Sequence, residues 1–374
     1  MSKLSLETSE PTAVGSGFIS GLLSAILGIA GLGVVLALRF PEYLASGQLN
    51  QHHVLQYLRA GVHVVLIASF LLGTVSASLR ENKTLALFGI GLTLAAALLG
   101  GSQPPPAVAG AERSWLGLDF FVLNLILYSA VFVPLERWFA LRAEQPVFRR
   151  HWVLDLTYFF LNSLLIEVLT ILTLRPALIF FGWARVEAVR TAIGGLPLVL
   201  QVPALLLVAD FTQYWVHRAF HSSRLLWPFH AIHHSIEEMD WLAGSRLHLV
   251  DVIVTRGLTY VPIFVLGFSE SALVAYVFLV ATQATFIHAN VGWVFRALQP
   301  FVVTPAFHHW HHSAERNAID KNFAVHTPIW DRLFGTYYLP ARWPAAYGLA
   351  DGREVPCRWI GQLVYPVRPR ATRR

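Results

Sequence analysis

The chain has 374 residues, of which 55% are hydrophobic and only 13% are charged, and its mean hydropathy is +0.53. Soluble domains carry about 25% charged residues, so this composition excludes an ordinary cytosolic enzyme, while the aromatic content of 13% excludes a disordered chain. The single cysteine, Cys357, excludes a disulfide framework and a cysteine-ligated zinc or iron–sulfur site. In a membrane protein, the net charge of +6 indicates topology and lipid contact rather than nucleic-acid binding.

Apolar stretches long enough to cross about 30 Å of hydrocarbon follow one another along most of the chain. They cover residues 14–38, 60–79, 84–101, 115–135, 153–183, 193–214 and an apolar hairpin over 249–287. The fifth and sixth contain ionisable residues, which generally face a helix bundle or a wet cavity rather than lipid. The sequence therefore predicts an all-α, polytopic integral membrane protein with about eight hydrophobic segments.

The hairpin also predicts where two histidine-rich segments, 217–248 and 288–335, lie. Because the hairpin returns the chain to the face that it left, both segments are expected on the same side of the membrane, in a helical cap. Short loops on that side carry seven Lys or Arg residues, against five on the opposite side, and an Arg-rich tail adds to the excess. The positive-inside rule then predicts a cytoplasmic cap. The preference for Arg over Lys indicates a GC-rich bacterial genome and therefore favours a bacterial cytoplasmic membrane.

Histidine is the unusual residue, since 11 of the 16 histidines fall between residues 217 and 312. The spacings HxxxH at 217–221 and HxxHH at 230–234 and 308–312 place imidazoles on one face of a helix. Within these motifs, only His309 points away from the helical face that the other imidazoles share. Eight clustered imidazoles without a cation would leave donors and acceptors in conflict, and imidazole suits Fe, Zn, Cu and Ni. One ion cannot use eight ligands, so the pattern predicts a dinuclear metal site.

The sequence lacks the motifs of two other common histidine-containing metal sites. The chain has no HExxH and no ExxH, which excludes the usual zinc-protease motif and the carboxylate-bridged site of ferritin-like bundles. A transition-metal transporter or binding protein stays open as an alternative. This alternative is disfavoured because the histidines cluster at the ends of membrane segments and few acidic residues could line a path for metal ions through the membrane.

Two ionisable residues near the histidines allow two interpretations each. Asp210 lies seven residues before His217 on the same helical face, where it could accept the second ring N–H of a ligating imidazole or instead cap or pair with an arginine. Arg246 could hold a lipid headgroup or pair with Asp240, and the pair is favoured slightly.

From about residue 150 to 340 the chain resembles the fatty acid hydroxylase / sterol desaturase superfamily of integral-membrane oxygenases. The segments that carry this resemblance are His217-Arg-Ala-Phe-His221, His230-Ala-Ile-His233-His234, Arg246-Leu-His248, His288-Ala-Asn290-Val, Thr304-Pro-Ala-Phe-His308 to His312, Asn322-Phe323 and Trp330-Asp-Arg-Leu-Phe-Gly-Thr336-Tyr. The resemblance implies a di-iron centre that uses O₂ and two electrons to hydroxylate or desaturate a lipid C–H bond.

The resemblance also implies a set of metal ligands. These are His217, His221, His230, His233, His234, His288, His308, His311 and His312. Some relatives carry a further histidine four residues after the one matching His288, but this chain has Gly292 there. One ligand is therefore expected either to be absent or to be replaced by His248 or Asn290. His248, Asp210 and Asn290 are otherwise expected to hold a ligand in place.

The implied cofactors are two Fe ions, which Zn can replace in purified protein, and O₂. The implied partners are a membrane lipid substrate, the bilayer and a separate electron-transfer protein of ferredoxin or cytochrome b5 type, because the sequence lacks the His-Pro-Gly-Gly stretch of a fused cytochrome b5 domain. No nucleic acid is expected.

The predicted organisation is an N-terminal membrane region of unknown role over 1–114, a catalytic region over 115–340 and a basic tail over 341–374.

Overall fold

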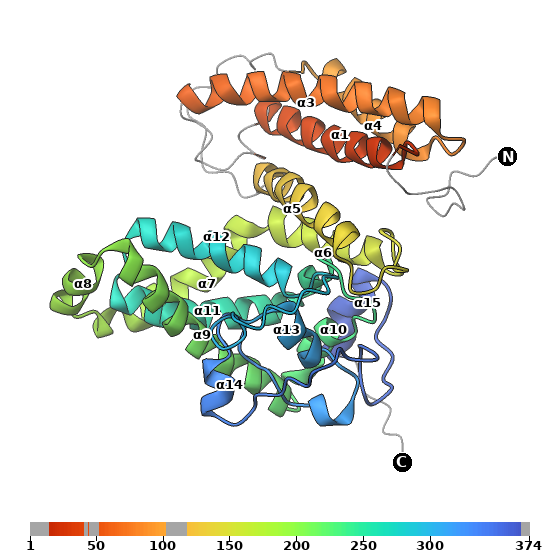
Figure 1. Cartoon of the computed structure of the whole chain (residues 1–374). Coiled ribbons are helices and arrows are strands. Elements are labelled where there is room, and N and C mark those ends of the chain that lie inside the picture. Colours follow the sequence, from red (N-terminus) through yellow and green to blue (C-terminus); the bar gives the residue numbers. More distant parts are fainter. Residues whose placement is uncertain (1–14, 41–43, 45–51, 102–117, 368–374) are drawn as a thin grey trace. The chain divides into compact units, whose positions relative to one another are not determined.

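The computed structural model describes residues 15–40, 44, 52–101 and 118–367, and within these ranges the chain forms helices and no β-strand (Figure 1). The predicted all-α fold class is confirmed. In chain order, with the labels of Figure 1, the helices are α1 (Phe18–Arg39), α3 (His52–Leu79), α4 (Thr84–Leu98), α5 (Leu118–Trp138), α6 (Trp152–Leu164), α7 (Ile166–Phe181), α8 (Glu187–Gly194), α9 (Leu198–Ser222), α10 (Trp227–His234), α11 (Leu249–Leu266), α12 (Glu270–Phe286), α13 (Pro305–His311), α14 (Ile329–Leu333) and α15 (Trp359–Val364).

The helices bear out a multi-pass membrane protein, but the expected number of about eight hydrophobic segments is not confirmed. Within the described ranges, four helices or parts of helices are long and apolar enough to cross a bilayer: Phe18–Arg39, Ala60–Leu79, Leu198–Ser222 and Leu249–Leu266. Trp152–Leu164 and Val168–Ala184 make a fifth span if this pair, bent by 55°, crosses as one. Helices α4 and α12 have 15 and 17 residues, whereas a span needs about 20 at 1.5 Å per residue. The predicted segment 115–135 begins outside the described residues.

The chain divides into two compact units. The first comprises Met1–Ala130 and Phe160–Val168, and the second comprises Val131–Phe159 and Leu169–Arg374. The predicted domain boundaries at residues 114 and 340 remain predictions.

Within the first unit, α1, α3 and α4 pack together through small and hydroxylated residues. Ser24 Oγ donates to the Ser69 carbonyl at 2.7 Å, and Ser69 Oγ donates to the Ser24 carbonyl at 2.8 Å. Thr93 Oγ1 joins them by donating to Ser69 Oγ at 2.8 Å. Gly89 packs against Ser24 so closely that a Cβ there would lie 2.6 Å from the Ser24 backbone carbon. Close backbone approach and hydroxyl bonds of this kind are typical of helices that associate in a membrane.

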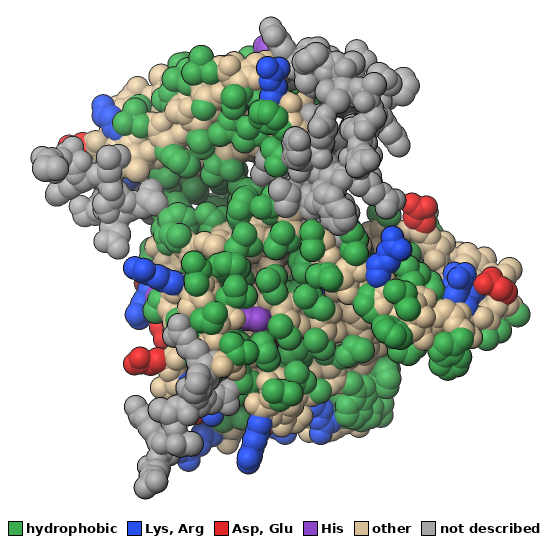
Figure 2. Space-filling view, turned by 180° about the vertical axis from the view of Figure 1, so that it is seen from behind, with side chains coloured by type: hydrophobic (Ala, Val, Ile, Leu, Met, Phe, Trp, Pro, Cys, Tyr) green, Lys and Arg blue, Asp and Glu red, His purple; other side chains and the backbone are tan. Residues whose placement is uncertain are grey.

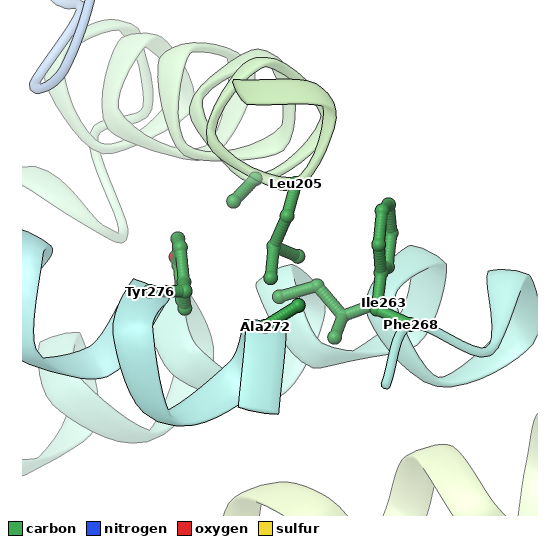
Figure 3. Packing of buried hydrophobic residues seen from close by; sticks show 6 residues of the cluster. Leu205, Ile263, Phe268, Ala272 and Tyr276 are labelled. Atoms are coloured by element: carbon green, nitrogen blue, oxygen red, sulfur yellow. The ribbon is translucent and has the colours of Figure 1, made fainter. Parts of the chain in front are cut away.

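Within the second unit, α9 packs against both α11 and α12, and the three helices share an apolar core (Figures 1 and 3). Leu205 of α9 meets Ile263 of α11 and Ala272 and Tyr276 of α12, all of them buried. Helix α11 ends at Gly267, whose φ of +75° allows the sharp turn into α12. The expected apolar hairpin over 249–287 therefore takes the form of α11 and α12.

Hydrophobic side chains are spread over much of the described surface shown in Figure 2. Trp183 and Val199 are among the most exposed large apolar residues, with 84% and 75% of their surface accessible. Monomeric soluble proteins rarely expose extended apolar patches, so this surface fits contact with lipid.

Candidate metal centre

Nine buried or nearly buried histidines of the second unit form two compact groups. The first histidine group consists of His217, His221, His230, His234 and His311, and the second consists of His233, His288, His308 and His312. Within each group, one ring nitrogen from every histidine lies within 4.8 Å of those of the others. The structure thus brings together every histidine that the resemblance implied as a ligand.

The local sequence explains how these side chains meet. His217 and His221 lie one turn apart on the last two turns of α9. Both HxxHH motifs lie on short helices, α10 and α13, and each of these has proline in its first turn, where proline is favoured because its missing N–H is not needed. His288 lies two residues beyond α12, and its ring fits because Gly244 faces it: a Cβ on Gly244 would lie 2.8 Å from His288 Nδ1.

In the first histidine group, acceptors outside the group contact the Nδ1 atoms of four of the five members. His217 Nδ1 lies 2.7 Å from the Phe323 carbonyl oxygen, and His311 Nδ1 lies 2.8 Å from that of Lys321. Two other members contact carboxylates. His230 Nδ1 is 2.6 Å from Asp251 Oδ2, and His221 Nδ1 is 3.3 Å from Asp320 Oδ1. Such acceptors fix the tautomer of a metal-ligating imidazole and leave its Nε2 free to ligate.

The second histidine group has no carboxylate contact among the interactions described. His233 Nδ1 lies 3.2 Å from the Arg246 carbonyl, and His288 Nδ1 lies 2.7 Å from the Ala284 carbonyl. The Nδ1 atoms of His308 and His312 are buried without a hydrogen-bond partner in the described part of the chain.

Within each group, ring nitrogens that face each other are both hydrogen-bond acceptors, so they need a cation between them. A carbonyl or carboxylate only accepts, so Nδ1 of His217 and Nδ1 of His230 must carry the proton, and Nε2 of each neutral ring is an acceptor. Yet these two Nε2 atoms are 2.9 Å apart. The same logic applies to His233 and His288, whose Nε2 atoms are 3.3 Å apart. A metal ion accepts both lone pairs at once, so the residues fit a metal.

Charge and burial keep the imidazoles in their ligating form. Burial lowers the pKa of His288 to about 4. Burial and then neighbouring imidazoles hold the pKa values of His233, His308 and His312 well below 6.5. These rings are therefore neutral at neutral pH, as metal ligation requires.

Asp210 does not take the role of a carboxylate that holds an imidazole of either group. Its Oδ1 accepts the backbone N–H groups of Val325 and His326 at 2.9 Å, and its Oδ2 accepts that of Thr327 at 2.8 Å. Seven residues are two helical turns, about 10 Å, so Asp210 lies too far along α9 to reach the ring of His217. It instead anchors the segment that follows Phe323, whose carbonyl contacts His217.

His248 and Asn290 also lie outside both groups. His248 Nδ1 accepts the Val250 N–H at the start of α11, and its Nε2 lies 3.1 Å from the Leu363 carbonyl. Asn290 pairs with the backbone of Arg142, accepting its N–H at 2.9 Å and donating to its carbonyl at 3.1 Å. Both side chains are committed to backbone groups, so neither replaces the histidine missing at Gly292.

Arg246 belongs to a buried ion network next to the second histidine group, and it does not pair with Asp240 as expected. Its Nε and Nη2 donate to Asp155 at 2.5 and 2.9 Å, while Arg149 Nη2 bridges Asp155 and Asp240 at 2.7 and 2.6 Å. All four side chains are buried. The network holds the Arg246 backbone, whose carbonyl contacts His233.

Sequence reasoning missed the carboxylates that contact imidazoles. Asp251 is buried in the first turn of α11, and Asp320 has a φ of 56° on an exposed turn. A carboxylate inside an apolar segment is a signal that could have found Asp251, because such groups generally face functional partners. Asp320 offers no comparable signal.

Comparison with known proteins agrees with this geometry. Residues 202–336 match the family model of fatty acid hydroxylases. The ornithine lipid hydroxylase OlsE of Rhizobium tropici is 31% identical over 173 residues, which cover 46% of this chain and 51% of that protein. Human alkylglycerol monooxygenase is 32% identical over 128 residues, 34% of this chain and 28% of that enzyme.

A fatty acid hydroxylase of Lecanicillium sp is 29% identical over 146 residues, covering 35% of this chain and 40% of that protein. The chain thus spans about half the length, or less, of these curated relatives. No solved structure matches the chain significantly. Residues 202–336 contain all nine grouped histidines, and this part of the chain is a fatty acid hydroxylase domain.

Proposed function

We propose that this protein is an O₂-dependent lipid hydroxylase of the membrane, with a dinuclear iron centre held by the two histidine groups. The paired Nε2 atoms that face each other without a proton between them carry this proposal. Two groups of five and four imidazoles fit two ions better than one, since a single ion binds at most about six ligands.

The reaction follows from what a lipid C–H bond requires. Such a bond has no acidic proton, so general acids and bases cannot activate it, and a bound iron pair would supply the redox chemistry with O₂. One oxygen atom enters the C–H bond as a hydroxyl group, and the other leaves as water after uptake of two electrons and two protons. Desaturation would begin from the same site.

The residues of this chain have separable roles in that scheme. The nine histidines would hold the ions, and Asp251 and the Phe323 carbonyl orient ligand rings. Burial of most of these imidazoles limits their contact with bulk water. Asp331 accepts the N–H groups of Phe323 and Ala324, both at 2.8 Å, and so fixes the strand-like segment that presents the Phe323 carbonyl to His217.

The comparisons and the exposed helices support a lipid substrate. The named relatives act on an ornithine lipid and an alkylglycerol, and the exposed apolar helices fit access to a bilayer lipid. We propose a separate donor of ferredoxin or cytochrome b5 type and a cytoplasmic histidine cap. The transport alternative gains no support, because the named relatives are hydroxylases and monooxygenases.

Elemental analysis of detergent-purified, iron-reconstituted protein tests the proposal. We expect close to two ions per chain and hydroxylated lipids in a host that expresses the protein. Zinc in place of iron would still agree with the site, because imidazole accepts either metal. Absence of stoichiometric metal after reconstitution would refute the dinuclear centre, and altered host metal content with an unchanged lipid profile would favour transport.

A further inference from the structure

A cavity of about 350 Å³ opens directly beside the first histidine group. Its inner wall includes His221, His234 and His311, and none of the residues that line it belongs to the second histidine group. The buried Nε2 atoms of these three histidines have no hydrogen-bond partner among the described residues. The cavity therefore gives access from the surface to the candidate metal centre through the first histidine group.

The outer part of the cavity carries charges of both signs. Arg316, Asp320 and Asp351 line it, and all three are exposed. Asp351 forms a pair with Arg353 at 2.8 Å, but nearly half of each side chain remains accessible, and ion pairs this exposed contribute little and exchange readily. A ligand with one anionic and one cationic group would match this arrangement better than a purely anionic or purely apolar one.

The size of the cavity limits how much of a lipid can enter. Ligand pockets range from about 300 to 1,000 Å³, so this cavity is at the small end. It has room for a polar head and a few carbons, while the hydrocarbon tails would remain outside. Ile319, which is 47% exposed on the cavity wall, offers an apolar contact for the emerging chain.

We infer that this cavity binds the zwitterionic head of the lipid substrate, with Arg316 binding the anionic group and Asp351 the ammonium group. The carbon presented to the histidines then lies within a few bonds of the head, so the new hydroxyl group is formed in or next to the head and not along the tail. The oxygen and electron balance is that of the proposed hydroxylation, on which this inference rests.

Binding of short-chain lipids to the zinc-loaded, full-length protein tests the cavity without turnover. Titration calorimetry would compare dihexanoyl phosphatidylethanolamine, which has a phosphate and an ammonium group, with dihexanoyl phosphatidylglycerol, which lacks the ammonium group. We expect tighter binding of the ethanolamine lipid. Arg316→Gln should weaken both lipids about tenfold, whereas Asp351→Asn should weaken only the ethanolamine lipid by about that factor.

Arg358→Gln is the matched control, because it removes the same charge from an exposed residue that does not line the cavity. It should change neither affinity, and every variant should keep its metal content. Equal affinity of the parent protein for the two lipids, or unchanged binding by Arg316→Gln, would overturn the inference.

Tandem mass spectrometry of lipids from an expressing host supplies the second test. The added oxygen should appear in fragments that contain the head or the carbons next to it. A hydroxyl group in the middle or at the end of a tail would refute this inference but leave the proposed hydroxylase intact. No hydroxylated lipid despite full metal loading would instead refute the proposed function, and the binding data would still decide whether the cavity takes a zwitterionic head.

Discussion

The two histidine groups contain the same residue type and both take histidines from the two HxxHH motifs, yet the protein surrounds them differently. Carboxylates contact two members of the first group, Asp251 on His230 and Asp320 on His221. In the second group, the acceptors on His233 and His288 are neutral backbone carbonyls. A carboxylate makes an imidazole a more basic ligand than a carbonyl does. Histidines of the same two motifs therefore form inequivalent sites, and we expect the first group, with five imidazoles, to bind its ion more tightly.

Removing one ligand from each group gives the largest expected effect. His311→Ala should cost the first group its ion, and His308→Ala should cost the second group its ion, because each ring is buried among the nitrogen atoms that would bind the metal. Elemental analysis should then show about one ion fewer per chain in each variant. An unchanged metal content in either variant would contradict the assignment of that histidine as a ligand.

Arg246→Met tests how much the buried ion network next to the second histidine group contributes to stability. The change leaves part of the charge of buried Asp155 uncompensated, which typically costs about 3–5 kcal/mol. The free energy of unfolding of the metal-free protein, measured by denaturant titration in detergent, should fall by that amount. Arg150→Met is the control, since Arg150 is exposed and should contribute less than about 1 kcal/mol. Similar losses in both variants would rule out a special role for the network.

Asp251→Asn tests the carboxylate that distinguishes the first group. The amide cannot reproduce the charged contact to His230, so we expect the affinity of the tighter ion to fall about 10- to 100-fold in chelator competition. The affinity of the other ion should change little. Thr255→Val is the matched control, because it removes the Thr255 contact to Asp251 but keeps the carboxylate on His230. An equal loss at both sites would mean that Asp251 acts on the fold as a whole.

Acidification probes His288 of the second group. Burial lowers the pKa of His288 to about 4, whereas the ring in the unfolded chain has a pKa of about 6.5. Between these values the unfolded chain binds a proton that the folded chain does not, so stability falls as the pH decreases below 6.5. For this ring the loss amounts to about 2 kcal/mol at pH 5. Denaturant titration of metal-free protein at pH 7 and pH 5 should show a smaller loss for His288→Gln, and equal losses would contradict this reasoning.

His309→Phe should have the smallest effect. His309 lies next to a grouped histidine in sequence but outside both groups, and its Nδ1 contacts the Tyr347 hydroxyl at 2.8 Å. Replacing it removes one buried hydrogen bond, which costs about 1 kcal/mol. Metal content should remain equal to that of the parent protein, and loss of an ion would show that the ring does contribute to the centre.

The sequence was sufficient for the class of protein and for the identity of the grouped histidines. Composition excludes a soluble enzyme because too few charged residues are available to cover a surface in water. Helical periodicity places His230, His233 and His234 on one stripe, because positions three and four residues apart share a face. Family-specific spacing added His288, which no local periodicity connects to the others.

Only the tertiary structure decided which histidine belongs to which group. His233 and His234 are adjacent in sequence, yet they fall into different groups, because adjacent helical residues point about 100° apart and meet different partners. Asp210 shares a helical face with His217, but it lies two turns away from that ring and accepts backbone N–H groups instead. The pairing of Asp251 with His230 joins residues 21 positions apart on different helices. Spacing along one helix cannot reveal contacts between helices, and those contacts set the partners of each imidazole.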